Sequence, residues 1–106
     1  MGEPYIRKRY MEFVPILKEV GHRLPEYHNL IIEVNYQPRK RFIILMGTVT
    51  IALVPSNGTE IYDEIYSTKR FFRGEKQVED CVSKLAGDEE NLTELLLKYI
   101  GDGQRQ

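Results

Sequence analysis

Three strand-like segments in the middle of the chain constrain its fold more than any other feature. Residues 30–37, 41–54 and 59–72 are rich in β-branched and aromatic side chains. A Gln-Pro-Arg-Lys turn separates the first two segments, and a Pro-Ser-Asn-Gly turn separates the next two. Because Asn-Gly suits tight hairpins, the pattern predicts an antiparallel meander of three strands, or of four if Gly47 bulges within the long middle segment.

The middle segment is apolar on both faces, since side chains alternate across a strand. A two-residue Asn-Gly turn places Tyr62, Tyr66 and Phe72 on the same face as Ile51 and Leu53, and a one-residue slip would reverse this. Both faces then need a cover. Either the N-terminal and C-terminal helices cover one face each, or the second face is an oligomer interface or a ligand groove.

Helical spacing is found on both sides of the meander. A kinked amphipathic helix is expected before Gly21, broken at Pro15 by the missing donor. Its apolar positions are Ile6, Tyr10, Phe13, Val14, Leu17 and Val20. Two more helices are expected after residue 76, one ending at Gly87 and the other running from an Asp88 N-cap to Gly101. Residues 101–106 are expected to be a frayed tail.

The length of 106 residues suits one hydrophobic core and not two. The sequence therefore predicts a single α+β domain over residues 1–106: an antiparallel three- to four-stranded meander packed with the N-terminal kinked helix and two C-terminal helices. The longest apolar run, 42–46, is too short to cross a membrane, and the N-terminus does not resemble a secretory signal. A cytoplasmic location is expected.

Charge is unevenly distributed, although the formal net charge is only −1. Residues 1–76 hold 12 basic and 9 acidic residues, whereas residues 77–106 hold 3 and 7, so the balances are +3 and −4. The first part could face a polyanion while the acidic part faces elsewhere. Abundant Glu, Lys, Arg, Ile and Tyr are also typical of hyperthermophile proteins.

The residues that usually carry catalysis or bind metals do not form a site in this sequence. His22 and His28 share a loop with Glu26 but lack the spacing of a zinc site. Asp63 and Glu64 are adjacent in a strand and face opposite sides, so they do not form an acid–base pair. The lone Cys81 is expected to be a small buried hydrophobe. We expect no enzymatic activity, no bound metal and no cofactor.

Basic residues alternate with aromatic residues at two strand ends that a meander brings to the same edge of the sheet. Cations for phosphates and aromatic faces for unpaired bases are what single-stranded nucleic acid needs. Helices that could read a duplex groove do not carry these clusters. The cluster consists of the basic residues Arg39, Lys40, Arg41, Lys69, Arg70 and Arg73 around the aromatic residues Tyr36, Phe42, Phe71 and Phe72.

With these features the chain resembles the archaeal ThermoDBP and ThermoDBP-related proteins, which bind single-stranded DNA in a cleft on an antiparallel sheet packed with helices. The resemblance covers most of the chain at the level of architecture and composition. It implies phosphate contacts by the six basic residues, and base stacking on Tyr36, Phe42, Tyr62, Tyr66, Phe71 and Phe72. The chain departs from expectation in its negative net charge and in having no Trp.

Two functions follow as hypotheses. The first is sequence-tolerant binding of single-stranded DNA through phosphate contacts and base stacking on the sheet, with RNA not distinguished from DNA. The alternative is a homo-oligomeric structural or protein-interaction module with no nucleic-acid binding. A homodimer could form through the sheet or through a helical stripe, although that stripe could equally pack against the sheet. The stripe comprises Leu92, Leu95, Leu96 and Tyr99.

Overall fold

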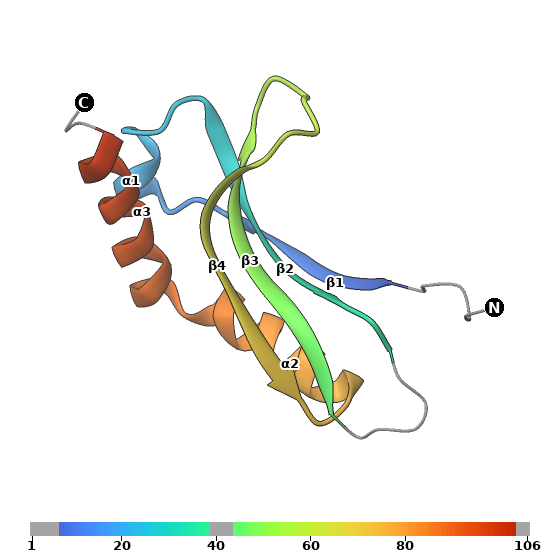
Figure 1. The fold of residues 1–106 in the computed structure, drawn as a ribbon. Helices are drawn as coiled ribbons and strands as arrows, with labels where there is room; N and C mark the ends of the chain where they lie inside the picture. The colour runs from blue at the N-terminus through green and yellow to red at the C-terminus, as the bar shows by residue number, and fades with distance from the viewer. Residues whose placement is uncertain (1–6, 39–43, 104–106) are drawn as a thin grey trace.

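Four antiparallel strands form one sheet in the order β1-β2-β3-β4 (Figure 1). The computed structural model describes residues 7–38 and 44–103. Each strand pairs with its neighbour in sequence, so the expected α+β meander is confirmed. The fourth strand comes from the N-terminal segment and not from an interruption at Gly47. The strands are β1 Lys8–Pro15, β2 Tyr27–Tyr36, β3 Leu45–Pro55 and β4 Asp63–Phe72.

The expected N-terminal kinked helix is wrong, because most of that segment forms β1. Tyr10 and Val14 are four residues apart, which suits a helical face but equally suits alternate positions of a strand. In the sheet they pair with Val34 and Leu30 of β2. Pro15 would remove a hydrogen bond inside a helix, but at the end of an edge strand it costs little.

The part of the N-terminal segment that is helical is short. α1 spans Lys18–Gly21 and has four residues. It buries Val20 against the core, and the chain then turns through Leu24, which is also buried, into β2. The segment therefore packs as a strand followed by one helical turn.

Two longer helices follow the sheet, as the sequence indicated. α2 spans Glu75–Gly87 and α3 spans Glu89–Gly103. Asp88 caps α3, since its Oδ1 accepts the backbone N–H of Asn91 at 3.2 Å. Gly101 does not end this helix, and the expected tail is helical up to residue 103.

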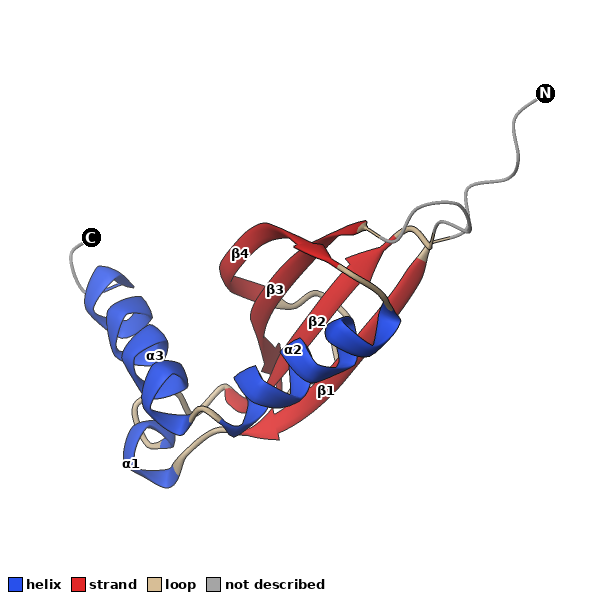
Figure 2. Cartoon of the chain, turned by 90° about the horizontal axis from the view of Figure 1, so that it is seen from below, coloured by secondary structure: helices blue, strands red, loops and turns tan. Residues whose placement is uncertain are grey.

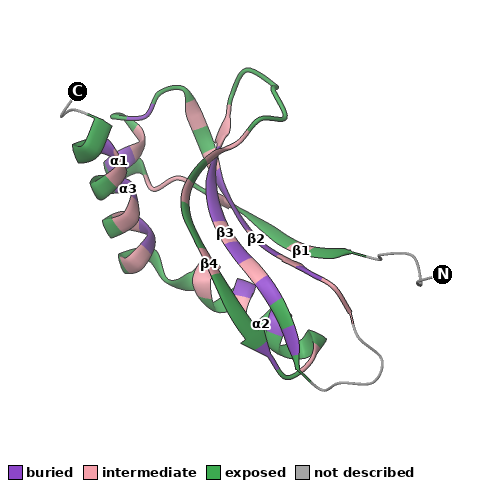
Figure 3. Ribbon diagram, viewed as in Figure 1, coloured by how far each residue is buried: buried purple, intermediate pink, exposed green. Residues whose placement is uncertain are grey.

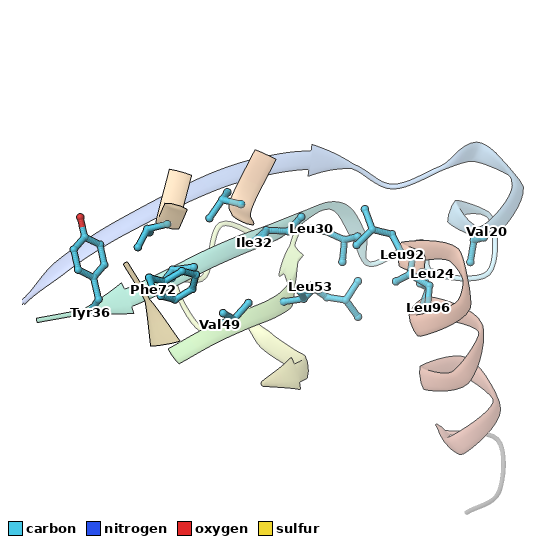
Figure 4. Packing of buried hydrophobic residues seen from close by; sticks show 14 of the residues in the cluster. Val20, Leu24, Leu30, Ile32, Tyr36, Val49, Leu53, Phe72, Leu92 and Leu96 are labelled. Carbon is cyan, nitrogen blue, oxygen red and sulfur yellow. The ribbon is translucent and has the colours of Figure 1, made fainter. Parts of the chain in front are cut away.

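The helices pack on one side of the sheet, which we call the helix side. Figure 2 shows α2 lying across the sheet and α3 extending away from it. Ile32, Ile51 and Val82 are fully buried where sheet and helices meet, and Figure 4 shows several of their neighbours in this core. The alternative of one helical layer on each face of the sheet is therefore wrong for the described chain.

Gly47 in β3 allows the ring of Phe72 to pack closely against the sheet at one end of the core. A Cβ on Gly47 would lie 2.8 Å from Val34 Cγ1 and 3.1 Å from Phe72 Cε2. The ring of Phe72 therefore rests where any other residue would place a side chain. Gly47 keeps regular pairing with Tyr36 and Arg70, so the bulge considered at this position is absent.

The bulge in this sheet lies further along β3 and β4. Ile51 pairs with Tyr66, whereas the next residue, Ala52, pairs with Glu64, so Ile65 is the additional residue. Beyond the bulge, Tyr66 does share the face of Ile51, as the sequence indicated. Tyr62 precedes β4 and is not part of the paired strand.

Within residues 7–38 and 44–103, none of the helices is both long enough and apolar enough to cross a bilayer.

Candidate nucleic-acid interface

The sheet face opposite the helix side, which we call the open face, has no helix packed on it in the described chain. One row of side chains crosses it from β1 to β4: Arg9 pairs with Asn35, Asn35 with Thr48, and Thr48 with Lys69. Arg9 and Lys69 are exposed, and the two residues between them are half-buried. The row therefore places two cations at its ends and hydrogen-bonding groups in its middle.

An aromatic side chain stands beside this row. Phe71 lies two residues after Lys69, on the same face, and pairs with Met46. Its side chain is 73% exposed and that of Met46 is 54% exposed. A cation and a free aromatic ring thus lie next to each other at one end of the open face.

An acidic residue reduces the charge of the row at its β1 end. Glu33, in the adjacent row, forms an ion pair with Arg9, with 3.1 Å between Arg9 Nε and Glu33 Oε2. Arg9 also lies near Met11 Sδ, at 3.0 Å. Lys69 is not among the ion pairs found in the described residues. The β4 end of the row is therefore the more available to an anion.

The other half of the open face is apolar except at its β4 end, where the exposed Glu64 pairs with Ala52. Phe13, 50% exposed, pairs with Ile31, and Ile31 pairs with Ala52. Ile31 is only 2% exposed although no described helix covers it. In Figure 1 the strands bend with the helices on the outer side of the bend.

Two of the expected stacking residues belong to the core. Tyr36 is 7% exposed and Phe72 is 3% exposed, and both pack with the helices. Burial, followed by the charge of Glu75, raises the pKa of Tyr36 above its ordinary value. Neither ring offers a face to a base, so we no longer include them among the stacking residues.

The remaining expected residues do not form one cluster. Tyr66 and Arg70 lie on the helix side, where the guanidinium of Arg70 is 6.0 Å from the Phe72 ring centroid and its Nη1 is 3.6 Å from Cys81 Sγ. Lys69 and Phe71 lie on the open face. Tyr62 is half-buried before β4, Arg73 is exposed after it, and four expected residues lie outside the described residues: Arg39, Lys40, Arg41 and Phe42.

Sequence reasoning missed the contribution of β1 and of the polar middle of the sheet. The sequence places Arg9 and Phe13 on an expected helix, from which Arg9 could extend the basic cluster only if that helix docked alongside, so neither residue is expected in a strand beside β2. Asn35 and Thr48 carry no signal in isolation, because polar residues are common on the outer face of a strand. A period-two reading of 8–15, with Tyr10 and Val14 inward, would have found the open-face residues of β1.

A pocket lies at the end of the sheet away from Lys69 and Phe71, with a volume of about 580 Å³. In it, the hydroxyl of Tyr27 donates a hydrogen bond to the Asp63 carboxylate. That bond and burial raise the pKa of Tyr27 above its ordinary value. The pocket is lined by Glu26, Tyr27, Pro55, Ser56, Asn57, Thr59, Ile61 and Asp63.

The histidine loop does not form a metal site in the part of the chain that the structure describes. No group of three or more His, Cys, Asp or Glu side chains is placed there to hold an ion. Cys81 is a free, half-buried thiol next to Arg70.

Comparison with known proteins does not assign a function to the open face. No family model matches the chain, and neither the curated proteins nor the solved structures give a significant match. The resemblance to the ThermoDBP proteins therefore stays a prediction.

Proposed function

We propose that the chain binds single-stranded DNA on the open face of its sheet, without strong sequence preference. The observation that carries this proposal is the register of β3 with β4, which puts Lys69 and Phe71 together on a face that no described helix covers. A lysine can bind a phosphate, and the neighbouring ring can stack with an unpaired base for about 1–3 kcal/mol.

The row between Arg9 and Lys69 supports the same function. Three strand spacings separate the two cations, which is roughly 14 Å at about 4.8 Å per spacing. Thr48 and Asn35 lie between them and can donate hydrogen bonds to phosphate oxygens or sugars. Contacts of these kinds position a strand without reading its bases, so the expected binding tolerates many sequences.

The binding test is fluorescence anisotropy with labelled single-stranded DNA, single-stranded RNA and duplex DNA of mixed sequence. We expect both single strands to bind better than the duplex and their affinity to fall steeply with salt. Phe71→Ala removes the stacking ring and should weaken binding about tenfold, whereas Tyr66→Ala, an aromatic of the same strand on the helix side, should not. Equal loss in both variants would contradict binding on the open face.

A charge placed in the middle of the open face gives an independent test. Thr48→Glu puts a carboxylate where the phosphates would lie and should abolish binding. Ser83→Glu adds the same charge to the exposed surface of α2 and is the matched control. Retention of binding by Thr48→Glu in a folded protein would refute the proposed location.

A second candidate function depends on the apolar half of the open face. Met11 and Phe13 are 42% and 50% exposed, and exposed apolar patches mark protein interfaces. This supports the alternative of a protein-interaction module. Absence of nucleic-acid binding at low salt, with salt-insensitive self-association that Phe13→Ser abolishes, would favour the alternative over the first proposal.

A further inference from the structure

The outer edge of β4 is a free strand edge in the described chain, since β4 ends the sheet and pairs there only with β3. A strand edge presents unpaired backbone N–H and C=O groups to any strand that can lie beside it. The opposite edge, β1, is less suited to pairing. Pro15 ends it, and Lys8 holds it to α2 through Glu75, with 3.1 Å between Nζ and Oε1.

The charges along β4 are ordered, with acidic residues at its start and basic residues near its end. Asp63 and Glu64 open the strand, and Lys69 and Arg70 come six residues later. Scattered charges commonly protect an edge from pairing. The order of charges in β4 opposes pairing with a parallel second copy, in which like charges would face each other. An antiparallel second copy instead places acidic residues opposite basic ones.

The bulge at Ile65 makes the two charged ends match in position as well as in sign. Counting from Ser67, Lys69 lies two sheet positions later. Glu64 lies three residues earlier but only two sheet positions earlier, because Ile65 and Tyr66 together occupy one position opposite β3. Without the additional residue, Glu64 would lie opposite Arg70, with both side chains on the helix side, and Lys69 would lie opposite Ile65.

The faces agree with this register. Glu64 pairs with Ala52 and Lys69 with Thr48, so both lie on the open face; Asp63 and Arg70 pair with residues of the helix side. Glu64, Lys69 and Arg70 are exposed, and Asp63 is half-buried at the strand end. Each acidic residue therefore meets a basic residue of the second copy on its own face.

We infer that two copies of this chain pair antiparallel along β4, with Ser67 on the two-fold axis. The product is one continuous sheet of eight strands, four from each copy. It contains two Glu64–Lys69 pairs on the open face and two Asp63–Arg70 pairs on the helix side. Cross-strand pairs of opposite charge stabilise a sheet, and like charges directly opposite destabilise it.

The dimer does not depend on nucleic-acid binding, and it pairs Lys69, which is proposed to bind phosphate, with Glu64 of the second copy. The two open faces lie on the same side of the joined sheet, because a two-fold axis perpendicular to a sheet preserves its faces. Variants at Thr48 and Phe71 test the binding, and Glu64→Lys, which leaves Lys69 in place, tests the dimer by sedimentation without nucleic acid, so the two ideas can fail separately.

The test is sedimentation equilibrium of the full chain and of charge-reversal variants. Glu64→Lys or Lys69→Glu alone turns both open-face pairs into repulsive ones, so the dissociation constant should rise about tenfold or more. The double variant restores opposite charges and should dimerise like the original chain. Glu94→Lys, an exposed charge reversal on α3, is the control and should have no effect.

Mixing the two single variants gives the most specific result. A chain with two lysines at these positions and a chain with two glutamates form matched pairs only with each other. We expect the mixture to dimerise while each variant alone stays monomeric, with unchanged circular dichroism showing that all are folded. A monomeric original chain, a dimer unaffected by single reversals, or a folded double variant and mixture that stay monomeric would each overturn the inference.

Discussion

Replacing Gly47 by alanine should destabilise the protein, although the same change usually strengthens a strand. The added Cβ would lie 2.8 Å from Val34 Cγ1. This is about 0.7 Å inside the shortest ordinary carbon–carbon contact of about 3.5 Å. Val34 is fully buried and β-branched, so its methyl group cannot rotate away freely. The ring of Phe72, 3.1 Å from the same position, blocks the other direction.

The net magnitude follows from two opposing effects. Overpacking a core costs about 1–3 kcal/mol. Loss of glycine's flexibility in the unfolded chain returns about 0.4–1 kcal/mol. We therefore expect Gly47→Ala to lower the free energy of unfolding by about 1–2 kcal/mol, which corresponds to a Tm decrease of about 5–15 °C in a domain of this size.

Urea unfolding followed by circular dichroism measures this change, and a second glycine provides the matched control. Gly101 lies in α3, and a Cβ there would have no neighbour within 4 Å. Gly101→Ala should stabilise the protein by about 0.5–1 kcal/mol through helix propensity. If Gly47→Ala proved neutral or stabilising, the close packing of Phe72 over the glycine would be refuted.

Two further predictions concern alkaline stability and a helix cap. The hydrogen bond to Asp63, followed by burial, raises the pKa of Tyr27 above its ordinary value of 10.0, so its stabilisation is complete below pH 10 and is lost as the pH rises through the raised pKa. Tyr27→Phe should therefore make the free energy of unfolding fall less steeply above pH 10, and the fall that remains is the part due to the buried Tyr36. If urea unfolding between pH 9 and 11 gave the same dependence of this free energy on pH for both proteins, the prediction would be contradicted. Asp88→Ala removes the acceptor of the Asn91 N–H and should lower the free energy of unfolding by about 1 kcal/mol, and equal urea midpoints for the two proteins would show that the cap contributes nothing.

The central strands and the C-terminal helices could be predicted because their signals are local. Runs of aliphatic residues such as Ile51 and its neighbours identify β2 and β3, and Asp88 marks where α3 begins. β1 could not be predicted in the same way. Tyr10 and Val14 fit both a helix and a strand, and the choice depends on the free edge of β2, which is a nonlocal feature.

The candidate site depended on details of pairing that the sequence does not reveal. At the Asn-Gly turn only Gly58 has a positive φ, of 81°, while Asn57 Oδ1 accepts the backbone N–H of Thr59 at 3.1 Å. The resulting loop is wider than a two-residue hairpin. Together with the bulge at Ile65 it determines which face each β4 side chain occupies. Phe72 lies on the face of Ile51, as the sequence indicated, and Phe71 lies on the open face.

Because the described helices pack on one side of the sheet only, evolutionary substitutions on the two faces of the sheet have different effects on the core. Figure 3 shows buried residues concentrated in β2 and β3, while β1 and β4 are largely exposed. Except at Ile31 and Ala52, substitutions on the open face leave the core untouched. The residues proposed for recognition and the residues that form the core thus alternate along the same strands, so the open face can change in sequence while the interior is kept.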